Sequence, residues 1–411
     1  MYNIIMYLTQ FCIAVGSCFS KKLRKMWRGE RVAIKVIREK IDPNAKYVWF
    51  HAASLGEFEQ GRPLIERVRK EYPEYKILLT FFSPSGYEVC KNYAVADIVT
   101  YLPIDTIINA RAFLRAIRPV MAFFIKYEFW YNYLHILQHR GIPTYSVSSI
   151  FRPEQVFFKW YGGGYSRVLH CFTHLFVQNE ESKQLLNSIG VKNSTVVGDT
   201  RFDRVLNIKE YCKQLPIIES FIHLSEDNKP KVFVAGSSWQ PDESVFLKYF
   251  NTRSDWKLII APHVINENHI KSIKSLLQNK KVVCYTQTTE DAVYNADVLI
   301  IDCFGLLSSV YRYGDITYVG GGFGVGIHNV LEAAVWGKPV IFGPNNKHFI
   351  EAQGLKRSGG GFEISDISTF STLMERLEKD TNFRLKSGAS GEEYVASLAG
   401  ASDKVLSKVK L

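Results

Sequence analysis

Glu57, at a turn between a strand and a helix, is placed to take a proton from a reacting hydroxyl group. It belongs to the segment VWFHAASLGEFEQGRPL (residues 48–64), in which an apolar strand pattern ends in HAAS and a helical pattern follows. Partial removal from water raises the pKa of a carboxyl group and suits it to general base catalysis. Ser54 and Glu57 also have the S-x-x-E spacing of a helix capping box, which the local sequence alone favours. His51, on the apolar strand, is expected to be a hydrogen-bonded core residue.

A glycine-rich loop between a strand and a helix offers a second kind of chemistry, the binding of a phosphate group. It lies in YVGGGFGVGIHNVLEAAVWGKPVIFGP (residues 318–344), where glycines let the backbone approach an anion closely. Its glycines are Gly320, Gly321, Gly322, Gly324 and Gly326. His328 and Asn329 stand at the predicted helix entrance, and Glu332 can accept hydrogen bonds from ribose hydroxyls. Asn329 and Glu332 equally have the spacing of an N-cap and its partner three residues on, so both roles stay open.

Small residues follow another predicted strand in VFVAGSSWQPDE (residues 232–243). Gly236, Ser237 and Ser238 can bring amide and hydroxyl groups to phosphate oxygens. An ordinary strand-to-helix turn has the same composition, so this segment alone does not decide between the two interpretations.

The segment KYEFWYN (residues 126–132) also follows a strand pattern. It supplies Glu128 and Trp130 as candidate contacts to a hydroxyl-bearing acceptor. Trp130 is equally compatible with a place in the core.

Composition limits the classes of protein that fit this chain. The formal net charge of +11 favours an anionic partner, either nucleic acid, phospholipid headgroups or a phosphorylated substrate. The seven cysteines are scattered without C-x-x-C pairs, which argues against a zinc site or a disulfide framework. Hydrophobic residues make up 46% of the 411 residues, enough to bury two domain cores and to exclude a mostly disordered protein.

The N-terminus has the pattern of a membrane anchor. Residues 1–20 carry no charged side chain and are followed at once by KKLRK. The basic cluster predicts that the rest of the chain stays on the cytoplasmic side, attached to the inner membrane. Polar residues within the stretch leave a buried N-terminal helix as the alternative.

The elements that must position these residues alternate along the chain in an α/β rhythm. Short apolar runs such as VMAFFI (120–125) and HLFVQ (174–178) are separated by amphipathic stretches, and the rhythm resumes with KVFVAGSS at Lys231. We therefore predict two Rossmann-like domains that face a cleft, where the loops after the strands meet. The predicted bounds are 1–30 for the membrane-associating segment, 31–205 for the first domain, 206–230 for a linker and 231–411 for the second domain.

Five motifs occur together in the order and spacing of the 3-deoxy-D-manno-octulosonic acid (Kdo) transferases, which this sequence resembles over nearly its whole length. They are HAASLGE, KYEFWYN, GDTRFDR, GSSWQPDE and GGGFGVGIHNVLEAA. The early HAxSxGE element joined to the late HNxxE element carries most of the resemblance.

The resemblance implies a type B glycosyltransferase fold, with lipid acceptor on the first domain and CMP-Kdo on the second. It implies transfer of Kdo to the lipid A precursor lipid IVA, without metal or other cofactor, in lipopolysaccharide core biosynthesis. Glu57 is then the expected general base of an inverting reaction, and Glu332 the expected ribose contact. The glycine loop with Gly236, Ser237 and Ser238 matches the nucleotide-phosphate region. Glu128 remains an acceptor-side candidate.

Four positions depart from the family pattern. Lys126 stands where an acidic residue is common, and His263 stands in APHV, which lacks the arginine of the usual APRH-like element. Gly305 lies in IDCFGLL, which lacks the glutamate of the usual GEL sequence. The usual arginine-rich loop is also altered, although Arg152 remains as a candidate contact to an anionic acceptor.

Two other functions fit parts of the sequence. Another nucleotide-sugar transferase or an epimerase of the same fold would explain the two α/β halves, although not the early HAASLGE element. A basic nucleic-acid-binding protein without enzymatic activity would explain the net charge. No RNP, KH or zinc-finger pattern supports it, so no nucleic-acid partner is expected.

Overall fold

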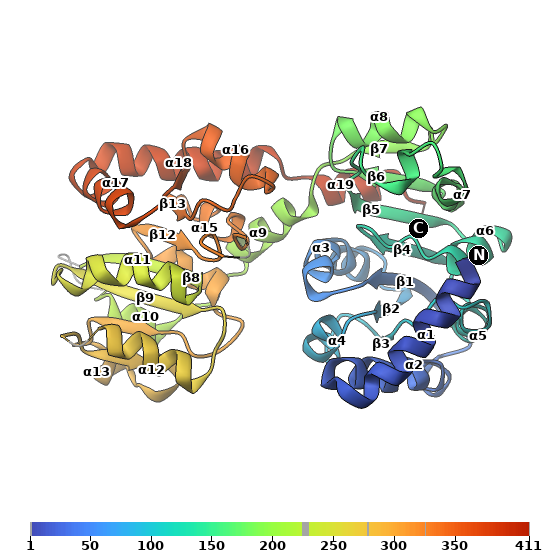
Figure 1. The fold of residues 1–411 in the computed structure, drawn as a ribbon, viewed down its shortest axis with the longest axis horizontal. Helices are drawn as coiled ribbons and strands as arrows, with labels where there is room; N and C mark the ends of the chain where they lie inside the picture. Colours follow the sequence, from blue (N-terminus) through green and yellow to red (C-terminus); the bar gives the residue numbers. More distant parts are fainter. Residues whose placement is uncertain (1, 224–229, 278, 325, 411) are drawn as a thin grey trace. The chain divides into compact units, whose positions relative to one another are not determined.

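The computed structural model describes residues 2–223, 230–277, 279–324 and 326–410, which form two compact units (Figure 1). The N-terminal unit comprises Met1–Arg204 together with Ala399–Leu411, and the C-terminal unit comprises Val205–Leu398. Each is built on a parallel sheet of seven strands covered by helices, which confirms the predicted α/β class. Of the predicted linker at 206–230, residues 224–229 lie outside the described part of the chain.

The sheet of the N-terminal unit has the strand order β3-β2-β1-β4-β5-β6-β7. Its strands are β1 Lys46–Ala52, β2 Tyr75–Phe81, β3 Ile98–Tyr101, β4 Met121–Ile125, β5 Thr144–Ser149, β6 His174–Val177 and β7 Ser194–Val196. The order of the strands reverses between β1 and β4, which pair directly, with Phe50 opposite Phe123. In sheets of this kind ligands bind beyond the carboxyl ends of the strands at such a reversal. The segments after β1 and β4 contain Glu57 and Glu128.

Helices cover both faces of this sheet (Figure 1). Their bounds are α1 Tyr2–Phe19, α2 Lys21–Lys40, α3 Leu55–Glu71, α4 Pro84–Cys90, α5 Ile107–Ile117, α6 Tyr131–His139, η1 Val156–Phe158, α7 Gly163–Ser166, η2 Arg167–Cys171, α8 Glu180–Ser188 and α19 Ala401–Leu406. Strand residues alternate between the faces, so Trp49 packs with α2, α5 and α6 while Phe50 packs with α3. Helix α9 (Thr200–Glu210) crosses the boundary between the two units.

The chain end returns to the N-terminal unit, whereas the sequence analysis assigned it to the second domain. Val405 of α19 is buried in the same core cluster as Phe50 and Val68. Asp203 accepts hydrogen bonds from the backbone N–H groups of Gly400 and Ser402, at 2.5 and 2.7 Å. The burial of apolar side chains thus ties residues 399–411 to a sheet far away in sequence.

The C-terminal unit repeats the architecture with the strand order β10-β11-β9-β8-β12-β13-β14. Its strands are β8 Lys231–Ser238, β9 Trp256–Pro262, β10 Val282–Cys284, β11 Val298–Ile300, β12 Ile316–Val319, β13 Val340–Phe342 and β14 Gly361–Glu363. Here the order reverses between β8 and β12, where Gly236 lies opposite Val319. The small residues at the end of β8 and the glycine-rich loop after β12 therefore meet at a ligand-binding edge.

The helices of the C-terminal unit pack on this sheet around a second core. They are α10 Pro216–Phe221, α11 Gln240–Asn251, α12 Glu267–Leu276, η3 Tyr285–Gln287, α13 Glu290–Val293, α14 Leu307–Val310, η4 Tyr311–Tyr313, α15 Leu331–Ala334, α16 Ile350–Ser358, α17 Ile367–Lys379 and α18 Thr381–Ser397. Phe246 of α11 and Phe370 of α17 pack with Phe233 of β8 in that core.

Helix α1 exposes most of its apolar surface. It has 18 residues with a mean hydropathy of 1.4, and of the helix only Ile13 and Ser17 are buried. Leu8 and Phe11 are 59% and 67% exposed. By length and composition α1 is the one helix in the described part of the chain that meets the requirements for crossing a membrane. The alternative of a buried N-terminal helix does not fit this exposure.

Candidate functional site

Glu57 sits in the first turn of α3, directly beyond β1. The backbone N–H of Ser54 donates to Glu57 Oε2 at 3.1 Å, as in a capping box. Burial raises the pKa of Glu57, and the nearby charge of Glu128 raises it further. His51 and Lys126 oppose this rise. The carboxyl group is therefore held by the backbone and has the raised pKa that suits a general base, so capping and proton transfer are compatible here.

Glu128 is buried in a hydrogen-bonded network with His51 and Trp130. Its Oε2 lies 3.0 Å from His51 Nε2 and accepts a hydrogen bond from Trp130 Nε1 at 2.6 Å. On the other side of the imidazole, His51 Nδ1 lies 2.9 Å from Thr80 Oγ1. His51 is fully buried with both ring nitrogens bonded, so it acts within the core to hold Glu128 near Glu57.

Lys126 begins a sharp bend at the end of β4. Its φ of 67° lies in the left-handed region, which is costly for a residue with a side chain and tends to occur at functional sites. The bend is held by the backbone N–H of Lys126, which donates to Val147, and by its carbonyl, which accepts from Ser149 Oγ. Lys126 Nζ lies 5.4 Å from the ring centroid of Tyr127. The bend directs the following Glu128 toward His51.

Arg152 reaches the same group of residues from the end of β5. It is exposed, and its positive charge acts on the hydroxyl of Tyr127. Burial raises the pKa of Tyr127, against which the positive charge of Arg152 acts. The structure thus brings the acceptor-side candidates Glu128 and Arg152 to neighbouring strand ends in the N-terminal unit.

The glycine and serines at the end of β8, and the first glycine after β12, have different environments. A Cβ atom on Gly236 would lie 2.0 Å from the hydroxyl of Tyr311, and one on Gly320 would lie 2.3 Å from the carbonyl oxygen of Ser237. Gly236 therefore permits β8 to pack closely on Tyr311, and Gly320 permits the loop after β12 to pack closely on β8. Ser237 is half-buried with a φ of 51°. Ser238 is fully buried and donates its hydroxyl to Glu243 at 2.8 Å, so that hydroxyl is used inside the unit.

The glycine-rich loop is folded largely on its own backbone. The N–H groups of Gly324 and Gly326 donate to the carbonyl of Gly321, each at 3.0 Å. The buried carboxylate of Asp242 accepts from the N–H of Gly321 at 2.9 Å and from the hydroxyl of Tyr318 at 2.7 Å. Asp242, which the sequence reasoning did not select, fixes this loop. The N–H of Gly321 is already occupied by that carboxylate.

Three aromatic side chains form a stack beside this loop. The ring centroids of His263 and His328 are 4.3 Å apart, and Trp239 stacks on His263 at 4.7 Å. Trp239 Nε1 donates to His328 Nε2 at 3.0 Å. Burial lowers the pKa of His328 to about 4, and electrostatic repulsion from His263 contributes to this. The ring of His328 is therefore neutral at physiological pH. The sequence reasoning missed Trp239 although it stands next to Ser238.

Glu332 is oriented by Asn329. The Asn329 side chain accepts from the backbone N–H of Leu331 at 3.2 Å and donates from Nδ2 to Glu332 Oε1 at 3.1 Å. The N-cap residue of the following helix is Val330, so Asn329 is not the N-cap that its spacing suggested, and it bonds the Glu332 carboxylate through its side chain. Helix α15 has four residues, Leu331–Ala334. Gly305 lies in a segment that departs from the family pattern. Its φ is 85°, and a Cβ atom added there would meet no heavy atom within 4 Å.

No group of three or more histidine, cysteine, aspartate or glutamate side chains in the described ranges is arranged to hold a metal ion. The charged side chains at the strand ends of the N-terminal unit are those of Glu57, Glu128, Lys126 and Arg152. In the N-terminal unit they can move a proton and bind an anion.

Comparison with known proteins connects this geometry to a chemistry. Residues 27–204 match the family described as 3-deoxy-D-manno-octulosonic-acid transferase (kdotransferase). A 3-deoxy-D-manno-octulosonic acid transferase from Rickettsia bellii is 28% identical over 376 residues, which cover 86% of this chain and 84% of that protein. One from Aquifex aeolicus is 27% identical over 338 residues, covering 80% and 85%.

Solved structures support the fold. The UDP-GlcNAc 2-epimerase from Neisseria meningitidis bound to UDP-GlcNAc superposes with a TM-score of 0.61 at 18% identity, covering 88% of this chain and 98% of that one. At this identity the likeness concerns the fold alone, and the fold is that of the type B glycosyltransferases.

Proposed function

Because this chain belongs to the Kdo transferase family of glycosyltransferases, which act in lipopolysaccharide synthesis, we propose that it transfers Kdo from CMP-Kdo to the lipid A precursor lipid IVA. The observation that carries the proposal is the setting of Glu57 within the HAxSxGE element. Its carboxyl group is fixed by the N–H of Ser54 and has a pKa raised by burial.

In this mechanism Glu57 takes the proton of the attacking acceptor hydroxyl. The hydroxyl oxygen forms a bond to the anomeric carbon of Kdo while the bond from that carbon to the CMP phosphate oxygen breaks. CMP leaves with the bonding electrons, and the configuration at the anomeric carbon inverts. A single displacement needs one base and no covalent sugar intermediate. Burial raises the pKa of Glu57, and Glu128, held by its bonds to His51 and Trp130, raises it further.

The donor belongs to the C-terminal unit in this proposal. Glu332, held by Asn329, has a carboxylate suited to accept hydrogen bonds from the ribose hydroxyls. Ser237 lies at the strand reversal between β8 and β12, where α/β units bind nucleotide phosphates. The neutral stack of Trp239, His263 and His328 offers flat aromatic surface at the same edge.

The acceptor belongs to the N-terminal unit, whose exposed Arg152 is suited to an anionic group. We place the protein on the cytoplasmic face of the inner membrane. The exposed apolar surface of α1 and the basic residues at the start of α2 support this location.

The test is direct transfer. Purified full-length protein is incubated with CMP-Kdo generated in situ and a tetraacylated lipid A precursor. The masses of the products are then measured by mass spectrometry. A mass increase of one or more Kdo residues supports the proposal and counts the additions. CMP should also raise the melting temperature more than UMP or UDP. Absence of transfer by a folded protein that UDP stabilises better than CMP would instead favour another nucleotide-sugar enzyme of the same fold.

A further inference from the structure

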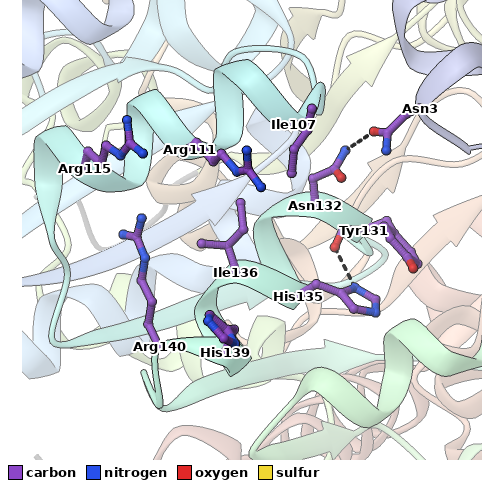
Figure 2. Close-up of a pocket in the computed structure, with 10 residues that line it drawn as sticks. All are labelled: Asn3, Ile107, Arg111, Arg115, Tyr131, Asn132, His135, Ile136, His139 and Arg140. Carbon is purple, nitrogen blue, oxygen red and sulfur yellow. Dashed lines mark hydrogen bonds between the residues drawn. The ribbon is translucent and has the colours of Figure 1, made fainter.

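A basic pocket lies between α5 and α6 of the N-terminal unit and is lined by none of the residues assigned above to Kdo transfer. Its volume is about 460 Å³, and its walls carry Arg111 and Arg115 from α5 and His135, His139 and Arg140 from α6 and the residue after it. Figure 2 shows the three guanidinium groups along the space between the two helices. Among the residues that the structure describes, no aspartate or glutamate lines the pocket.

The described residues form no ion pair that neutralises the positive charge of this pocket. Among the described residues, neither Arg111 nor Arg115 forms an ion pair or a side-chain hydrogen bond, and Arg140 donates only to the carbonyl of Leu114, at 2.9 Å. Burial and the like charges of Arg115 and Arg118 lower the pKa of Arg140. Crowded guanidinium groups without a carboxylate are stabilised by a bound anion, and their forked donors match phosphate oxygens.

His135 adds a directed group to the same wall. Its Nδ1 lies 2.8 Å from the carbonyl oxygen of Tyr131, so Nδ1 carries a proton that it donates there. The imidazole also stacks on the ring of Tyr131 at 3.9 Å between centroids. These two contacts leave Nε2 directed away from that bond (Figure 2).

The start of the apolar helix α1 forms one side of the pocket. Asn132 Nδ2 donates to Asn3 Oδ1 at 2.8 Å, as Figure 2 shows, and the hydroxyl of Tyr2 donates to the buried Asp105 at 2.7 Å. The next residues of α1 turn apolar side chains outward, with Ile4 64% exposed. The basic pocket is therefore next to the surface that the protein would present to a lipid bilayer.

A second, apolar pocket adjoins the first and shares Asn3 and Tyr131 with it. Its volume is about 470 Å³, and Phe129, Phe157 and Tyr165 are among its walls. A cationic pocket joined to an apolar one matches a ligand with an anionic head and an apolar remainder. It matches a free inorganic anion less well, because such an anion would leave the second pocket without an occupant.

We propose that the basic pocket binds the phosphate monoester headgroup of a membrane lipid, with the apolar part of that lipid against Phe129, Phe157 and the exposed side of α1. Arg111 and Arg115 supply forked donors to the phosphate oxygens, and Arg140 and the histidines complete the cationic wall. The inference concerns binding at the membrane surface, so a failure of the Kdo transfer test would leave it unaffected.

The test measures binding of the full-length protein to vesicles by sedimentation. Phosphatidylcholine vesicles that contain phosphatidic acid provide the monoester. The pocket variant carries Arg111→Gln and Arg115→Gln, and the matched control carries Lys70→Gln and Lys192→Gln, which remove the same charge from exposed positions elsewhere in this unit. Because each lost hydrogen bond joins two charged groups, the pocket variant should bind about 10-fold more weakly or worse, and the control should change by less than about 2-fold.

Further measurements separate the pocket from general charge and from free phosphate. The double variant Arg111→Lys, Arg115→Lys keeps the positive charge but lacks the paired N–H donors of the guanidinium groups. It should bind about 3-fold more weakly than the natural protein. Equal losses in the glutamine and control variants would overturn the proposal in favour of general electrostatic attraction. Phosphatidylglycerol vesicles that bind as tightly would overturn the monoester assignment. Displacement of the vesicles by inorganic phosphate at a concentration equal to the lipid phosphate would assign the pocket to a free anion.

Discussion

Replacing Glu57 by glutamine separates proton transfer from helix capping, because glutamine keeps the shape and one acceptor oxygen but is a very poor base. A positioned general base contributes about 100- to 10,000-fold to the rate, or about 2.7 to 5.5 kcal/mol of transition-state stabilisation. We expect Glu57→Gln to lower turnover by that factor. Initial rates are measured by mass spectrometry at saturating CMP-Kdo and acceptor. Glu66→Gln, which changes another half-buried glutamate of α3, is the matched control and should keep nearly normal turnover.

The stability of this variant follows from the local contacts and from the raised pKa. The N–H of Ser54 can still donate to the glutamine oxygen, and loss of the charge near the helix start costs about 0.3–1 kcal/mol. In the other direction, burial raises the pKa of Glu57 above its unfolded value. The stability that this group contributes is therefore present below the unfolded pKa and is lost as the pH rises through the folded pKa. Glutamine does not titrate, so at neutral pH the variant should melt within a few degrees of the natural protein.

The complementary variant is Ser54→Ala, which removes the N-cap hydroxyl and leaves the carboxylate. It should cost about 0.5–2 kcal/mol of stability while the surviving folded enzyme turns over nearly normally. The pH dependence adds an independent check, because kcat/KM of the natural protein should rise as Glu57 loses its proton. A folded Glu57→Gln protein with near-normal turnover would remove this residue from the catalytic assignment, although the similarity to Kdo transferases would remain.

Five further changes test other parts of the structure. Glu128→Gln removes a negative charge that raises the pKa of Glu57, so the acidic limb of the kcat/KM profile should move to lower pH; an unmoved limb contradicts this. Glu332→Gln should weaken the use of CMP-Kdo with little change in melting temperature, and unchanged nucleotide affinity and rate would leave capping as its role. Gly322→Ala places a Cβ 2.6 Å from neighbouring backbone and should cost about 1–3 kcal/mol by thermal denaturation. Gly324→Ala, with its nearest contact at 3.9 Å, should cost much less. Removal of residues 1–20 should move the protein toward the soluble fraction in low detergent, and identical partitioning of the two forms would refute the anchor.

Local patterns in the sequence determined the fold class and the principal strands. The run VMAFFI at 120–125 became β4 (Met121–Ile125), and HLFVQ became β6, because apolar β-rich runs between turn residues form buried parallel strands in most contexts. The contact between Ser54 and Glu57 was also predictable, since it depends on residues three positions apart.

Contacts between distant segments could only be decided by the tertiary structure. His51 and Glu128 are 77 residues apart and meet because β1 and β4 pair. The stack of His263 on His328 depends likewise on two separate strand ends of one sheet. An amphipathic stretch specifies a buried face but not the surface that buries it, so the return of residues 399–411 to the N-terminal unit was not predictable.

In the basic pocket, too, the sequence determined one part of the arrangement and the tertiary structure determined the other. Arg111 and Arg115 have the four-residue spacing that places two side chains on one face of a helix, which the sequence alone determines. The sequence did not indicate that Arg140 and the start of α1 would line the same space. That arrangement depends on the packing of α5 against α6 and on the bond between Asn3 and Asn132, which form only when the apolar side chains between the helices and the sheet are buried.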